Sequence, residues 1–320
     1  MSVHDAPLHS VERVKPLRAG YTRLKQMKKM KLLYLMMLIP IIHLFIFHYI
    51  PIYGIVIAFK KFSPGRGIID SPWNNFEHFK FLFTDFLFIR ALKNTIIISL
   101  LKLVVGFPAP IIFALLLNEI RQAVFKRIAQ SISYLPHFMS WVILATMLGE
   151  VLSPQRGIVN FVITSFGGQP TNFLAEPHLF VPILILSDVW KEIGWGAIIY
   201  LAALSSINPD LYEAAEVDGA NRFKQALHIT LPSLMPIMTI LFILNLGNIL
   251  NVGFDQILNL YNPMVYEVAD VIDTYVYRKG LEQFNFDYAA AVGLFKNVVG
   301  VVLILGANFI IRRYSEHGIW

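Results

Sequence analysis

Long apolar segments constrain the fold of this chain more than any other feature. A helix needs about 20 largely apolar residues to cross a bilayer, and residues 32–59 contain no Asp, Glu, Lys or Arg at all. Five more segments meet the same length. In chain order, the six candidates cover residues 32–59, 94–117, 132–152, 179–204, 234–254 and 288–311. The pattern predicts an all-α polytopic membrane protein with six transmembrane helices.

The composition supports this class. Hydrophobic residues make up 56% of the chain and charged residues 15%, whereas a soluble domain carries about 25% charged residues. There is no cysteine, which excludes a disulfide framework and a thiolate metal site. The basic N-terminal stretch could belong to a signal peptide, but the apolar run after it is too long and no cleavage pattern follows. We therefore interpret residues 32–59 as a retained first span.

Lys and Arg residues predict how the spans are oriented. With six spans, residues 1–31, the 118–131 connection, the 208–232 loop and the C-terminal tail lie on one side. All four are basic, and residues 1–31 alone contain eight Lys or Arg. Cytoplasmic segments carry the excess of Lys and Arg, although the opposing 60–93 connection also has six. We expect both termini in the cytoplasm, so the net charge of +6 indicates membrane orientation rather than a nucleic-acid partner.

The polar loop before the fifth segment carries the most specific pattern. Residues 213–232 read EAAEVDGANRFKQALHITLP. Residues 211–216 favour a helix, Gly219 permits a sharp bend, and residues 221–228 favour a second short helix. The local sequence thus predicts two short helices joined at a glycine, projecting from the membrane with negative charge on their surface. An ordinary amphipathic linker and a docking surface for a soluble protein both fit this description.

The spacing within this loop resembles the EAA loop of binding-protein-dependent ABC importer permeases. Glu213, Ala214 and Ala215 are followed at the family's offsets by Gly219 and, further on, by Ile229, Leu231 and Pro232. Other segments resemble carbohydrate-type permeases, and the closest match is the subfamily assigned to oligosaccharide and polysaccharide uptake. The segments that carry this resemblance are 48–68, 73–95, 156–177, 254–281 and 286–299.

The resemblance implies an organisation and a set of partners. Residues 1–31 would be a basic cytoplasmic tail, residues 32–313 the transmembrane permease domain with a coupling loop at 208–232, and residues 314–320 a cytoplasmic C-terminal tail. Within the loop, Glu213, Ala214, Ala215, Asp218 and Gly219 would dock on an ATP-binding subunit. Two such subunits, a second related permease and an extracytoplasmic solute-binding protein would complete the importer in a bacterial cytoplasmic membrane. The chain has no G-x-x-x-x-G-K-[ST] motif, so we expect ATP and Mg²⁺ on the partner subunits and no cofactor here.

Two sets of polar residues inside the apolar segments suggest a substrate pathway. The fourth segment has Asp188, Lys191, Glu192 and Trp195 at positions i, i+3, i+4 and i+7, which form one helical stripe. In the fifth, Asn245, Asn248 and Asn251 recur every three residues. Polar groups in a membrane are costly unless they face a cavity or a partner. The stripes could line a route for sugars, or they could hold helices together by hydrogen bonds.

Other charged and polar residues near the spans allow alternative interpretations. Lys102 and Lys296 are expected to be paired or to reach the interface, although with Lys191 they leave an anionic, alginate-type cargo conceivable. His137 and the other histidines near the spans lack metal-ligand spacing, and we assign them to packing. No nucleophile-elbow or H-E-x-x-H motif occurs, so an intramembrane enzyme and a secondary carrier are remote alternatives to a transport subunit without enzymatic activity.

Overall fold

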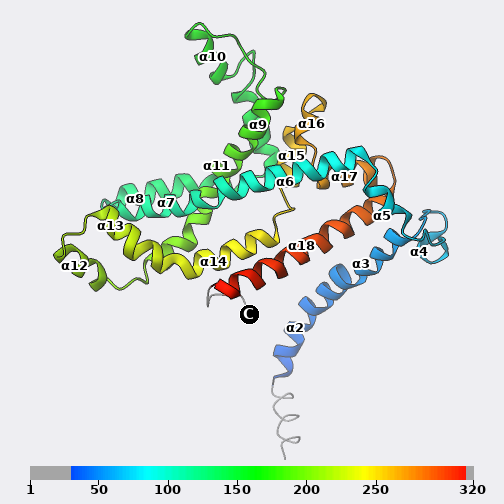
Figure 1. Ribbon diagram of the computed structural model, residues 1–320, viewed down its shortest axis with the longest axis horizontal. Helices are drawn as coiled ribbons and strands as arrows, with labels where there is room; N and C mark the ends of the chain where they lie inside the picture. The colour runs from blue at the N-terminus through cyan, green and yellow to red at the C-terminus, as the bar shows by residue number, and fades with distance from the viewer. Residues whose placement is uncertain (1–29, 315–320) are drawn as a thin grey trace, which may run out of the picture. The chain divides into compact units, whose positions relative to one another are not determined.

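The computed structural model describes residues 30–314, so the predicted tails at 1–31 and 314–320 lie almost entirely outside the described residues. Within the described residues, the only extended pairing is a single bridge between Lys60 and Trp73. Helices and their connections make up the rest (Figure 1). The predicted all-α class is confirmed.

The chain divides into two compact units at Ile55 and Val56. In the first unit, α2 (Lys31–Leu44), a π-helical turn (Phe45–Tyr49) and α3 (Ile50–Ile52) follow one another without a break. Pro51 has no N–H to donate back along the helix, and the wider π-turn lies directly before it. The helical backbone continues as a 3₁₀-helix, η2 (Tyr53–Phe59), so the predicted first span is confirmed as one helical run from Lys31 to Phe59.

The second unit contains the remaining helices. In chain order they are α4 (Gly67–Asp70), α5 (Glu77–Leu82), α6 (Phe86–Gly106), α7 (Pro108–Glu119), α8 (Ala123–Tyr134), η3 (Leu135–Phe138), α9 (Trp141–Val151), α10 (Ile158–Ser165), α11 (Pro177–Leu204), α12 (Asp210–Val217), α13 (Arg222–Gln225), η4 (Ala226–Thr230), α14 (Leu231–Gly247), α15 (Phe254–Leu260), η5 (Pro263–Val265), α16 (Tyr266–Ala269), α17 (Ile272–Tyr277), η6 (Arg278–Glu282) and α18 (Phe286–Tyr314).

The second span is longer than predicted. α6 and α7 form one apolar run of 34 residues, Phe86–Glu119, which begins before the predicted start at residue 94. The Asp85 side chain sets that start, because its Oδ1 accepts a hydrogen bond from the backbone N–H of Leu87 at 2.9 Å and so caps the helix. Before α6, the connection contains the short helices α4 and α5.

The third predicted span, residues 132–152, is wrong as a single helix. α8 with η3 and α9 meet at an angle of 106°. Pro136 lies within η3, and Ser140 caps the N-terminus of α9 by accepting from the N–H of Ile143. Because the chain leaves helical geometry at Met139 and Ser140, the apolar pattern continues across a sharp turn. The hydropathy pattern alone therefore does not reveal this turn.

α11 is the helix on which the bundle is built. It packs against α6, α7, α8 and α14, and two apolar clusters include its buried residues, Leu184 in one and Ala197 in the other. α14 and α18 run side by side (Figure 1). Among residues 30–314, four helices are long and apolar enough to cross a membrane, or five with the bent pair. α11 has the length but also three charges. Six spans remain compatible with this arrangement.

Candidate functional site

The coupling loop, residues 208–232, folds as the sequence predicts in its first half. α12 ends at Val217, and Gly219 has φ +75°, in the left-handed region that other residues rarely adopt. The N–H of Ala220 then bonds to the carbonyl of Ala215 at 2.8 Å, which closes the helix end. The second half differs, because α13, η4 and α14 are continuous from Arg222 to Gly247. The loop is therefore one short helix attached to the base of a long one.

The outer face of α12 is exposed. Glu213, Ala214, Asp218 and Gly219 are exposed, and Ala215 is half-buried. Within the described part of the chain, the carboxylates of Glu213, Glu216 and Asp218 form no salt bridge or side-chain hydrogen bond. Charged groups without internal partners at an exposed helix are available to another protein, so the geometry is compatible with the docking role that the sequence predicts.

The inner side of α12 is anchored. The hydroxyl of Tyr212 lies 2.9 Å from the Oγ1 of the buried Thr230 in η4, and Arg222 lies 3.7 Å from Glu119 at the end of α7. A cleft of about 590 Å³ separates α7 from the coupling loop. Tyr212 thus joins α12 to the long helix that runs from Arg222 to Gly247.

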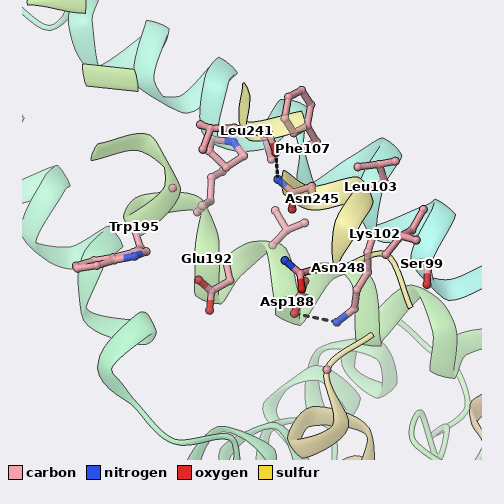
Figure 2. Close-up of a pocket in the computed structure, with 18 of the residues that line it drawn as sticks. Ser99, Lys102, Leu103, Phe107, Asp188, Glu192, Trp195, Leu241, Asn245 and Asn248 are labelled. Carbon is pink, nitrogen blue, oxygen red and sulfur yellow. Dashed lines mark hydrogen bonds and ion pairs between the residues drawn. The ribbon is translucent and has the colours of Figure 1, made fainter. Parts of the chain in front are cut away.

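A second, polar cavity of about 490 Å³ lies among α6, α7, α11 and α14, and Figure 2 shows the side chains that face it. We call it the central cavity. Its polar lining comes mainly from six of the seven predicted pathway residues and from a serine and a lysine of α6. These side chains are Ser99, Lys102, Asp188, Glu192, Trp195, Asn245, Asn248 and Asn251.

Lys102 is fixed at one side of the central cavity. Its Nζ lies 2.9 Å from Asp188 Oδ1 and 2.6 Å from Gln256 Oε1. Gln256 is fully buried and its amide donates to the Leu184 carbonyl at 2.7 Å and to Ser187 Oγ at 3.0 Å. The expectation that Lys102 is paired is confirmed. The sequence pattern does not indicate a role for Gln256, because a single glutamine in FDQILNL has no periodic spacing with other polar residues.

The three asparagines reach the central cavity, but not as one helical stripe. α14 ends at Gly247, so only Asn245 lies on the helix, and Asn248 and Asn251 lie in the turn that follows. Asn245 and Asn248 each donate to the carbonyl four residues earlier, at 2.8 and 3.2 Å. All three are exposed. Each amide therefore keeps hydrogen-bonding capacity that faces the cavity.

The fourth-segment residues divide between two environments. Asp188, Glu192 and Trp195 line the central cavity, whereas Lys191 does not. Lys191 is buried and its Nζ donates to backbone carbonyls of Pro136, His137 and Met139. Gly194 makes this approach possible, because a Cβ at that position would lie 2.2 Å from the Ser133 carbonyl oxygen of α8. Among residues 30–314, no group of three or more His, Asp or Glu could hold a metal ion.

Comparisons with known proteins agree with this architecture. Residues 106–316 match the family described as "Binding-protein-dependent transport system inner membrane component". The Polygalacturonan/rhamnogalacturonan transport system permease protein YteP of Bacillus subtilis (strain 168) is 46% identical over 290 residues, which cover 91% of this chain and 90% of the relative. Protein LplB of the same organism is 42% identical over 301 residues, which cover 94% of this chain and 95% of LplB.

A solved structure has a similar fold. The crystal structure of a bacterial ABC transporter involved in the import of the acidic polysaccharide alginate contains a chain that is 45% identical to this one. The two superpose with a TM-score of 0.85 over 92% of this chain and 99% of that chain. This chain therefore belongs to the family of inner-membrane components of binding-protein-dependent transport systems.

Proposed function

We propose that this chain is the membrane-spanning subunit of an ATP-driven importer of acidic oligosaccharides or polysaccharide fragments. The observation that carries the proposal is the central cavity, a polar space of about 490 Å³ between apolar helices, within the size range of small-ligand pockets. The relatives support the cargo class, because the names of two of them specify polygalacturonan or rhamnogalacturonan and alginate, which are all built from or contain uronic acids.

The lining of the central cavity suits sugar hydroxyls. The amides of Asn245, Asn248 and Asn251 can both donate and accept, which matches a hydroxyl group. The indole of Trp195 offers a flat apolar surface to the C–H face of a sugar ring. Together these groups would bind a saccharide weakly at several points, as a pathway requires if the cargo is to leave again.

The charges that line the central cavity indicate which part of the importer selects anionic groups. Lys102 is the one cation among the lining residues, and it already pairs with Asp188, while Glu192 adds a second carboxylate. The lining therefore has no net positive charge. We assign hydroxyl recognition to this chain and selection of the anionic groups to the solute-binding protein and the second permease.

The coupling loop would connect this pathway to ATP. We propose that α12 docks on one of two ATP-binding subunits, which bind ATP and Mg²⁺, and that Glu213 pairs there with a basic residue. The Lys and Arg distribution supports a cytoplasmic position for this loop and for both termini. A related transporter has been crystallised with an alginate pentasaccharide-bound periplasmic protein, which supports delivery of the cargo from the opposite side.

Reconstitution tests the proposal. The chain would be assembled in liposomes with its second permease and ATP-binding subunits, and ATP hydrolysis measured with the solute-binding protein loaded with oligogalacturonate, oligoalginate or neutral oligosaccharides of equal length. We expect the acidic oligosaccharides to stimulate hydrolysis and uptake. Stimulation by the neutral series alone would contradict the acidic cargo, and transport by this chain without ATP-binding subunits would favour a secondary carrier.

A further inference from the structure

A buried lysine of the neighbouring helix α11 donates hydrogen bonds to the backbone at the break between α8 and α9. Lys191 of α11 is 7% exposed, and its Nζ lies 3.3, 2.6 and 3.0 Å from the carbonyl oxygens of Pro136, His137 and Met139. Carbonyls at the end of a helix lack intrahelical partners and carry partial negative charge. The Pro136 carbonyl also accepts from the N–H of Met139 at 3.1 Å. The ammonium group contacts all three carbonyls at once, so it joins η3 to α11.

This fixation determines where the side chain of His137 lies. Its ring stacks on the indole of Trp195 with centroids 4.4 Å apart and planes 2° from parallel. Its Nδ1 lies 2.9 Å from the Oε2 of Glu192. Phe138 meets the same indole edge-on, with centroids 5.5 Å apart. The residues of η3 therefore contact the two side chains of α11 that line the far side of the central cavity from Lys102 (Figure 2).

These contacts restrain the side chains without burying them. Trp195 remains 43% exposed, and the side chain of Glu192 is also 43% exposed. A tryptophan at an open cavity would otherwise be free to change rotamer. With one ring face covered by imidazole and an edge met by Phe138, the indole has a defined plane. A defined plane lowers the entropy lost when a ligand stacks on it.

We propose that His137 is a positioning residue for saccharide recognition: it holds Trp195 as a flat platform and orients the Glu192 carboxylate beside it. Lys191 supports this arrangement by fixing the backbone that carries His137. The proposal rests on the proposed function, since it assigns the stacking surface for a sugar ring within the same cavity. His137 itself need not touch the cargo.

Three substitutions separate the two contacts of His137. His137→Phe keeps a ring against Trp195 but removes the bond to Glu192, His137→Asn keeps a polar group but removes the stacked ring, and His137→Ala removes both. His178, an exposed histidine near Glu176, provides the control variant His178→Ala. The reconstituted transporter would be titrated with loaded solute-binding protein, and the half-saturating concentration and the maximal ATPase rate measured.

We expect His137→Ala to raise the half-saturating concentration about three- to tenfold, the effect of losing an aromatic pair, with little change in the maximal rate. His137→Phe should be milder than His137→Asn, and His178→Ala should behave as the wild type. In a Trp195→Ala background, His137→Ala should lose most of its effect and keep only the smaller part that acts through Glu192. An equal additional loss in that background would overturn the proposal.

A second measurement does not require a cargo. With the other tryptophans replaced by phenylalanine, the emission of Trp195 reports directly on its surroundings. Because the imidazole covers one of the two ring faces, His137→Ala should increase collisional quenching by acrylamide about twofold, and His137→Phe should not. Unchanged quenching in His137→Ala would refute the positioning role. If no saccharide stimulates the wild type, the proposed function has failed, and this measurement still decides whether His137 positions Trp195.

Discussion

Acidic side chains are paired within the chain around α17 and form no ion pair in the coupling loop, among the described residues. Around α17, the fully buried Asp270 forms a two-pronged bond with Arg278, at 2.8 and 2.5 Å, and also accepts from Thr274. Asp273 pairs with Lys296, and Asp85 accepts from Tyr275. We call these pairs the α17 network. Each acid in the network has found a partner within the chain.

The coupling loop carries a comparable number of acids without such partners. Glu213, Glu216 and Asp218 are exposed and, within the described residues, unpaired. Breaking a pair of the network should destabilise the chain itself, because a buried charge left without its partner is costly. The acids of the loop contribute little to that stability and are free to interact with another protein. The difference predicts that substitutions in the two regions will affect different measurements, stability in one and coupling in the other.

The largest effect should follow from breaking the buried pair of the α17 network. Arg278→Ala leaves the Asp270 carboxylate buried without its counter-charge, which should lower the free energy of unfolding by about 3–5 kcal/mol. Purified protein in lipid nanodiscs should show a clearly lower apparent melting temperature and a lower yield. Lys61→Gln is the matched control, because the Lys61–Glu77 pair is exposed on both sides and such pairs contribute little. Equal losses in both variants would remove the distinction.

A charge change in the coupling loop should leave stability intact and reduce transport. Glu213→Gln removes the carboxylate that we propose pairs with a basic residue of the ATP-binding subunit. Losing a hydrogen bond to a charged group costs about 1.5–3 kcal/mol, which corresponds to about a 10- to 100-fold weaker docking. Substrate-stimulated ATP hydrolysis and uptake should fall together, while the apparent melting temperature of the isolated chain stays unchanged. Glu216→Gln on the same helix is the control. A melting temperature lowered as much as in Arg278→Ala would contradict the comparison.

The bend of the coupling loop should tolerate only certain residues. Gly219 has φ +75° and open space where a Cβ would stand, so strain in the backbone and not a clash limits the position. Gly219→Val should cost about 1–2 kcal/mol locally and shift α12, reducing the uptake per ATP hydrolysed. Gly219→Asn, which adopts this conformation more readily, should retain more coupling. Equal coupling in the two variants would show that the angle at residue 219 does not position α12.

The sequence predicts best those features that depend on neighbouring residues. The bend at Gly219 and the helix before it are local, and both are found where they were expected. Long apolar segments predicted the class of fold, but the break between α8 and α9 was missed because both sides of it are equally apolar. The predicted fifth span, residues 234–254, lies too far along the chain: the helix runs from Arg222 to Gly247, and the apolar pattern continues past its end.

The sequence pattern predicts poorly the positions of side chains whose partners are distant along the chain. Lys191 lies about 60° around the helix from Asp188 at 100° per residue, at the margin of the predicted stripe, and that margin faces η3 instead of the cavity. The partners of Gln256 lie 69, 72 and 154 residues away along the chain, and those of His137 lie 55 and 58 residues away. Nothing in the local pattern indicates these contacts, because they depend on how α11 packs.

The smallest effect should come from a hydrogen bond within the α17 network, and its pH dependence distinguishes it from a packing defect. Burial raises the pKa of Asp85, but the bonds from Tyr275 and from the N–H of Leu87 outweigh it and hold that pKa below the usual 3.8. The stabilisation is therefore present above about pH 5 and is lost as the pH falls through the folded-state pKa. Tyr275→Phe should lower the free energy of unfolding by about 0.5–1.5 kcal/mol at neutral pH, and the difference from the wild type should shrink in acid. A constant difference in melting temperature between pH 3 and 7 would assign the loss to packing and separate Asp85 from the ionised groups of the network.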